Sequence, residues 1–210
     1  MKMPPMLAYT VQSTPWQNNA PSVTIDVGAN KTGMWPATNQ DDSYWFCIID
    51  GKNPRVKVKD WVLPGTSNST VPAGIDTYMN DPNYLFAVAT QYLNTLHVPQ
   101  GPLYDFLVKY GAGRELQKLE QVNAVLGCGG YGRVGYVLTG QCGPRKPGEP
   151  APPSYEVAQF FGNQAMLLMS LMPPMSSGST YSICDSYTWK SPSVGAAAAS
   201  STKAKAKAKA

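Results

Sequence analysis

Gly127, Gly129 and Gly132 have the G-x-G-x-x-G spacing that is found where a chain wraps a dinucleotide pyrophosphate. Such a site needs a strand before the glycines and a helix after them, because the amides at the helix N-terminus bind the phosphates. Here the order is reversed, since the sequence predicts a helix before Gly127 and a strand after Gly132. We therefore interpret these glycines as a tight turn, and we expect no cofactor.

A cysteine nucleophile with a histidine base is the second chemistry that the residue types allow. Cys47 or Cys128 could supply the thiol, and His97, the only histidine, could supply the base. No flanking pattern supports this pairing, and the acidic residues form no metal loop or paired-carboxylate motif. The four cysteines also lack zinc-site spacing. The sequence favours a protein that is not an enzyme; a carbohydrate-processing or thiol-dependent enzyme is the alternative.

The net charge of the chain comes from its C-terminal end. Lys203, Lys205, Lys207 and Lys209 alternate with alanine, and without them the chain has 13 basic and 13 acidic residues. Such a segment could bind an anionic polymer, including nucleic acid, through salt-sensitive contacts, or it could only improve solubility.

The N-terminal residues show no signal-peptide pattern, and no apolar stretch reaches the roughly 20 residues that span a bilayer. We expect no membrane span, and we favour an intracellular or virus-particle setting over secretion.

Hydrophobic periodicity predicts the elements that must position these groups. We expect an α/β fold with a small mixed β-sheet that is sandwiched or backed by helices. The expected strands are residues 22–28, a hairpin over 43–63, and residues 102–111, 132–140 and 179–189. The expected helices are residues 80–96, 113–127 and 154–172.

Composition divides the chain into four parts. We expect an N-terminal arm with one strand at 1–43 and an α/β core at 44–143. A Pro-rich linker with a helix–strand extension follows at 144–190, and a disordered Ala/Ser/Lys tail at 191–210.

Several short motifs follow one another within residues 44–143. They read "FCIIDGKNPRVKV", "GIDTY", "LNTLHVPQG", "PLYDFLVKYGAG", "AVLG" and "GRVGYVLTGQCG". Their order and spacing resemble the interleukin-like EMT inducer (ILEI/PANDER-like, or GG) domain family. Members of that family include cytokine-like proteins, carbohydrate-linked modules and parts of phage long tail fibres. The resemblance implies a small module that recognises or scaffolds without catalysing, for example a virion or tail-appendage component, with carbohydrate or a protein assembly partner as its ligand.

Four residues near the hairpin and the loop at 64–80 are candidates for a ligand or partner surface. They are Trp61, Asp76, Tyr78 and Asn80. Aromatic faces bind the C–H patches of sugars, and planar polar groups bind their hydroxyls. The alternative is that Trp61 and Tyr78 only complete the hydrophobic core.

Overall fold

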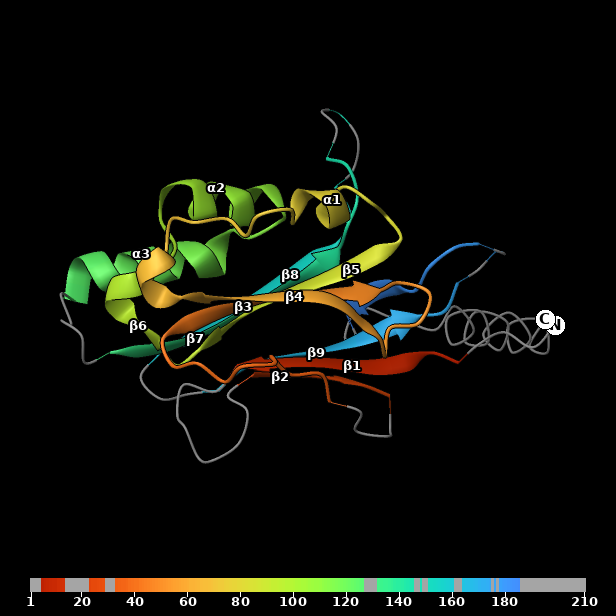
Figure 1. The fold of residues 1–210 in the computed structure, drawn as a ribbon, viewed down its shortest axis with the longest axis horizontal. Coiled ribbons are helices and arrows are strands. Elements are labelled where there is room, and N and C mark those ends of the chain that lie inside the picture. Colours follow the sequence, from red (N-terminus) through yellow and green to blue (C-terminus); the bar gives the residue numbers. More distant parts are fainter. Residues whose placement is uncertain are drawn as a thin grey trace, which may run out of the picture.

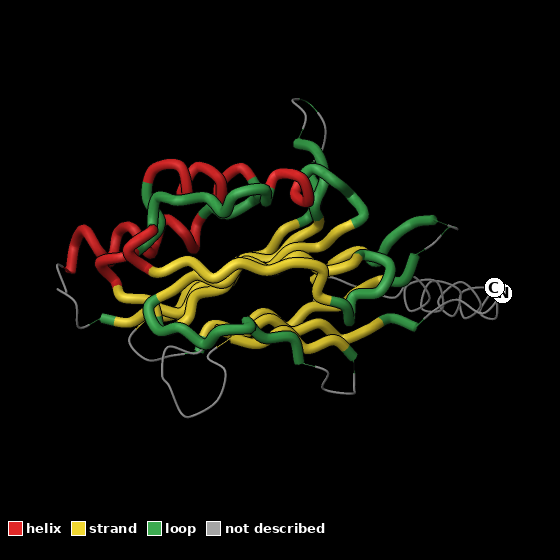
Figure 2. Tube along the Cα trace, in the orientation of Figure 1, coloured by secondary structure: helices red, strands yellow, loops and turns green. Residues whose placement is uncertain are grey.

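The computed structural model describes residues 5–13, 23–28, 33–126, 132–145, 148, 151–160, 164–174, 176 and 178–185. These residues form three layers, with helices above one β-sheet and a second β-sheet below it (Figure 1). Figure 2 shows the same arrangement, with the helices on one side of the strands. The described residues are mostly β, with 44% strand and 20% helix.

The lower sheet, sheet A, joins strands from both ends of the described chain. Its order is β10 (Ser182–Asp185), β9 (Ala165–Met172), β1 (Leu7–Ser13) and β2 (Val23–Val27), and all neighbours are antiparallel. Residues 1–43 thus contribute two strands, where the sequence indicated one. These strands share their sheet with β9 and β10, which come from the segment at 144–190.

The central sheet, sheet B, is also antiparallel. It is built from β4 (Lys57–Pro64), β3 (Ser43–Asp50), β5 (Tyr84–Gln91), β7 (Arg133–Gln141) and β8 (Ser154–Phe160). The short β6 (Leu93–Asn94) continues β5 along β7 after Tyr92, which has a positive φ of 50°. Val134 of β7 accordingly pairs with Leu93 on one side and with Phe160 on the other.

Sheet B is buried on both faces. Tyr44, Phe46 and Ile48 of β3 belong to the core under the helices, whereas Trp45, Cys47 and Ile49 belong to the core between the sheets. The helical layer consists of α1 (Asp76–Met79), α2 (Gly101–Lys109) and α3 (Arg114–Leu126), with 3₁₀ turns η1 (Gly65–Ser67) and η2 (Thr95–His97).

The structure corrects the expected α/β class with its mixed sheet. Helices do cover one face of sheet B, but two segments that we expected to be helical are strands, and all neighbouring strands run antiparallel, including β5 and β7, whose connection contains α2 and α3. The expected elements that agree with the structure are β2, the β3–β4 hairpin, α3, β7 and the described part of β10.

The helix expected at 80–96 is wrong. The apolar run Leu85–Ala89 lies in β5 and is buried on both faces, and such a run cannot be distinguished from a buried helix by its spacing. Asp81 accepts the Asn83 amide at 2.9 Å in a turn before β5.

The strand expected at 102–111 is also wrong, because these residues form α2. Leu103, Phe106 and Leu107 are buried at the i, i+3 and i+4 positions of a helix, and Pro102 lies in the first turn. The helix expected at 154–172 is replaced by β8 and β9. In β9, buried residues such as Met169 and Leu171 alternate with more exposed ones, which is the period of a half-buried strand.

Glu156 of β8 joins the edge of sheet B to the start of α3. Its carboxylate accepts the amides of Gly113, Glu115 and Leu116 at 2.9, 2.8 and 3.2 Å, and the Tyr136 hydroxyl donates to it at 3.0 Å. A side chain from another element thus performs the role of a helix N-cap. The Glu115 carboxylate in return accepts the amide of Ala158 in β8 at 3.3 Å.

Replacement of this carboxylate should destabilise the fold. We expect Glu156→Gln to lower the free energy of unfolding by roughly 2 kcal/mol, because an NH₂ group then faces donors that need an acceptor. Urea unfolding followed by circular dichroism measures the change. Gln117→Ala, on an exposed position of α3, is the control and should stay within about 0.5 kcal/mol of the wild type. Equal stability of Glu156→Gln and the wild type would contradict the capping role.

Gly111, between α2 and α3, is required for two reasons. Its φ is +102°, and a Cβ there would lie 1.7 Å from Oγ and 2.8 Å from Cβ of Ser154. Gly74 shares the positive φ, at +76°, but a Cβ there would have no heavy atom within 4 Å.

Alanine variants of Gly74 and Gly111 separate the cost of backbone strain from the cost of a steric clash. We expect Gly74→Ala to cost about 1 kcal/mol of unfolding free energy and Gly111→Ala about 3 kcal/mol, because only the second also forces β8 and α2 apart. Thermal and urea unfolding of both variants measure this. Equal losses would show that the approach of Ser154 does not matter.

Candidate functional site

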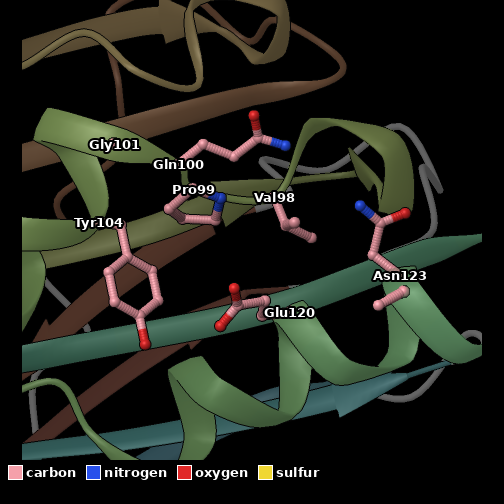
Figure 3. A pocket seen from close by; sticks show the side chains of 8 residues that line it. Val98, Pro99, Gln100, Gly101, Tyr104, Glu120 and Asn123 are labelled. Carbon is pink, nitrogen blue, oxygen red and sulfur yellow. The ribbon is translucent and has the colours of Figure 1, made fainter.

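A cavity of about 270 Å³ lies between the start of α2 and the exposed side of α3. Figure 3 shows Tyr104 of α2 and the segment Val98–Gln100 on one side, with Glu120 and Asn123 of α3 opposite them. Val98 and Pro99 are buried, whereas Gln100 and Glu120 are exposed. The cavity therefore has an apolar base and a polar rim.

Backbone hydrogen bonds hold the segment that forms one wall of this pocket. The Gln100 amide donates to the Asn68 carbonyl at 2.8 Å, and the Asn68 side chain donates to the Val98 carbonyl at 3.0 Å. Gly101, with a φ of +48°, then turns the chain into α2 and places Tyr104 less than one turn further along. The opposite wall is set by α3, where Glu120 and Asn123 are three residues apart on one face.

The pocket is polar and slightly acidic. Partial burial, and then the carboxylates of Glu120, Asp105 and Glu156, raise the pKa of Tyr104 above its usual value. The phenol thus remains a neutral hydrogen-bond donor at physiological pH. No lysine or arginine lines the cavity among the residues that the structure describes.

The lining residues have the chemistry that a sugar ring requires. The Tyr104 ring offers an aromatic face, the Gln100 and Asn123 amides can donate and accept, and the Glu120 carboxylate accepts hydroxyl protons. A small number of polar groups around a partly apolar hollow fixes the orientation of a small ligand.

The structure also brings together the four residues predicted from sequence. Trp61 of β4 packs edge-on against Tyr78 of α1, with ring centroids 6.0 Å apart, and Tyr78 packs similarly against Tyr84 at 5.4 Å. Asp76 and Asn80 are exposed on α1, where the Asn80 side chain donates to the Asp76 carbonyl at 2.9 Å.

Trp61 and Tyr78 are half-buried and pack against the core under the helices. This packing agrees with their expected alternative role in the core. A ligand role for the four residues stays a prediction.

Sequence reasoning missed the pocket residues Gln100, Tyr104, Glu120 and Asn123. Glu120 and Asn123 lie in a helix that was predicted correctly, and their spacing of three residues places them on one face. Tyr104 lies in the segment that was predicted as a strand, so its position opposite α3 could not be inferred.

His97 is held by hydrogen bonds that do not involve a thiol. Its Nδ1 lies 2.6 Å from Oδ2 of Asp42, whose Oδ1 accepts the Asn94 amide at 2.9 Å. The Tyr44 hydroxyl donates to the His97 carbonyl. Cys47 instead lies in the core between the sheets. The pairing of Cys47 with His97 that the alternative hypothesis requires is therefore not formed, and Cys128 lies outside the described residues.

Burial also makes two of the thiols poor nucleophiles. Burial, and secondarily the Asp60 carboxylate, raise the pKa of the Cys47 thiol far above its usual value. Burial and the Asp81 carboxylate raise the pKa of the Cys142 thiol to about 12. Because the thiolate is the reactive form, both groups are unreactive at neutral pH.

Thiol titration tests this directly in a Cys128→Ser, Cys184→Ser double variant. We expect no reaction of Cys47 or Cys142 with Ellman's reagent at neutral pH in the folded protein, because both side chains are buried and protonated. Both should react completely in concentrated guanidinium chloride. Rapid labelling of either thiol in the folded state would disprove the prediction and revive the thiol-enzyme alternative.

The glycine-rich segment has the predicted order of elements. Helix α3 precedes it and strand β7 follows it, while Gly127 and Gly129 lie outside the described residues. Gly132 approaches η2 closely: its carbonyl accepts the Thr95 amide at 3.1 Å, and a Cβ there would lie 2.6 Å from Cγ2 of Thr95. The segment thus leads from helix to strand, the reverse of a dinucleotide site.

Three further expectations concern metals, membranes and the C-terminal lysines. In the described ranges, no group of three or more metal-ligating side chains comes together. No helix in those ranges has the length and apolar character to cross a bilayer. Lys203, Lys205, Lys207 and Lys209, with the rest of the expected tail, lie outside the described residues.

No family model matches this chain, and no curated protein matches it. The resemblance to the ILEI domain family stays a prediction. Within the range of this resemblance, the helix expected at 80–96 and the strand expected at 102–111 are observed as β5 and α2, a strand followed by a helix.

Proposed function

We propose that this chain is a non-enzymatic binding module that recognises carbohydrate through the pocket between α2 and α3. The observation that carries the proposal is the convergence of Tyr104, Gln100, Glu120 and Asn123 on one cavity of about 270 Å³. This volume is slightly below the usual range of about 300–1,000 Å³ for ligand pockets, which suits one sugar ring better than a large cofactor.

The charge of the pocket narrows the class of sugar. Glu120 lines the cavity without a cationic partner among the lining residues, so a neutral saccharide is favoured over one that carries a carboxylate, sulfate or phosphate. The Tyr104 phenol can donate to a ring or hydroxyl oxygen while its ring covers a C–H patch.

The chemistry near the pocket supports binding without turnover. Among the residues that the structure describes, Glu120 is the only carboxylate that lines the cavity, whereas glycoside hydrolysis uses a pair of carboxylates that flank the scissile bond. His97, the one histidine, is engaged with Asp42.

Binding of defined sugars to the full chain tests the proposal. Isothermal titration or ligand-observed NMR with glucose, galactose, mannose, N-acetylglucosamine and their disaccharides should detect at least one ligand. We expect Asn123→Ala and Tyr104→Phe each to weaken that binding about tenfold, which corresponds to about 1.4 kcal/mol, because each removes a hydrogen-bonding group.

Gln117→Ala is the matched control, because Gln117 is exposed on α3 but does not line the cavity. It should bind the same sugar with wild-type affinity. If no sugar of the panel binds, or if the pocket variants bind as the wild type does, the proposed function is wrong.

A further inference from the structure

The outer face of sheet A is a second surface with an unusual composition. All three described α-helices lie on the far side of sheet B, and none covers sheet A from below (Figure 1). The inward residues of β1, β2, β9 and β10 fill the core between the sheets, so the alternate residues point away from it. These are Ala8, Thr10, Gln12, Thr24, Asp26, Met166, Leu168, Ser170, Met172, Ser182 and Cys184.

This outer face is almost free of charge. Of the outward residues in the four described strands, Asp26 alone is ionisable at neutral pH, and it lies on the edge strand β2. A typical surface has about 25–35% charged residues. The side chains of Met166 and Leu168 in β9 are 49% and 47% exposed, and Met6, just before β1, is 48% exposed.

We infer that this face is an interface between two copies of the chain, stacked sheet against sheet. The inference goes beyond the proposed function and does not depend on the sugar pocket. Interface centres are depleted of charged residues and enriched in methionine. The outward residues of the two central strands β9 and β1 include no charged side chain, and those of β9 include Met166 and Met172.

Charge explains why a second copy fits better than a polyanion or a membrane surface. The outward residues of the four described strands include no lysine or arginine, so these side chains do not attract phosphate groups. Two copies related by a two-fold axis through β1 and β9 would place no like charges together at the centre. Their Asp26 carboxylates would lie towards the rim, where water screens them.

The size of the face indicates how strong this association is. Strands β1, β2, β9 and β10 contain 7, 5, 8 and 4 residues, and at a rise of about 3.4 Å per residue and a strand spacing of about 4.8 Å they give a face of roughly 400 Å². Two copies would bury on the order of 800 Å², less than a stable dimer needs, so the contact is a weak and transient one. We therefore expect a reversible dimer with a dissociation constant in the micromolar to millimolar range, about 1 μM to 1 mM.

Sedimentation velocity of the full chain over a range of concentrations tests the inference. The wild type should shift from monomer to dimer as concentration rises, and high salt should not abolish the shift, because the contact is apolar. Leu168→Lys and Met166→Lys should each weaken dimerisation at least tenfold, because each would place an unpaired charge in the interface.

Val108→Lys is the control, since Val108 is 44% exposed on α2, far from sheet A in the layer order. It should dimerise as the wild type does. Thr10→Lys on β1 gives a further variant on the same face if either lysine substitution in β9 disturbs the fold, as judged by circular dichroism. A wild type that stays monomeric, association that disappears at high salt, or folded face variants that dimerise normally would overturn the inference.

Discussion

The structure depends on one constraint: sheet B is the middle of three layers and must be apolar on both faces. Its strands β3, β5 and β7 contribute alternate side chains to the core under the helices and to the core between the sheets. A sheet in this position has two apolar faces, so other elements must pack against both of them. The helices α1, α2 and α3 supply one cover, and sheet A supplies the other.

The same constraint determines which elements could be predicted from sequence. The β3–β4 hairpin was predicted because its turn separates an apolar run from an alternating one, and α3 because Leu116 and Leu119 have helical spacing on an otherwise polar helix. In β5 a doubly buried strand has no polar alternation, so the spacing of Leu85, Phe86 and Ala89 also fitted a helix. In α2 the aromatic and β-branched composition indicated a strand, but tertiary packing on sheet B favours the helix.

The candidate site follows from how α3 is attached to sheet B. Glu156 binds the first amides of α3, and Glu115 binds the outward amide of Ala158, so the helix start and the edge strand β8 hold each other. This attachment also covers part of an open sheet edge. Glu120 and Asn123 lie one to three turns along the same helix, opposite Tyr104. Sequence could place two of these three residues on one helix face, but not the element opposite them.

Sheet A has a consequence for the order in which the chain folds during synthesis. Tyr9 of β1 pairs with Met169 of β9, so the first described strand obtains its neighbour only after most of the chain has left the ribosome. Without β9, strands β1 and β2 form only a two-stranded ribbon with one apolar face. Such a ribbon is marginally stable on its own. Contacts this distant along the sequence slow folding. The core between the sheets therefore lacks the side chains of β9 until residues 165–172 have been synthesised.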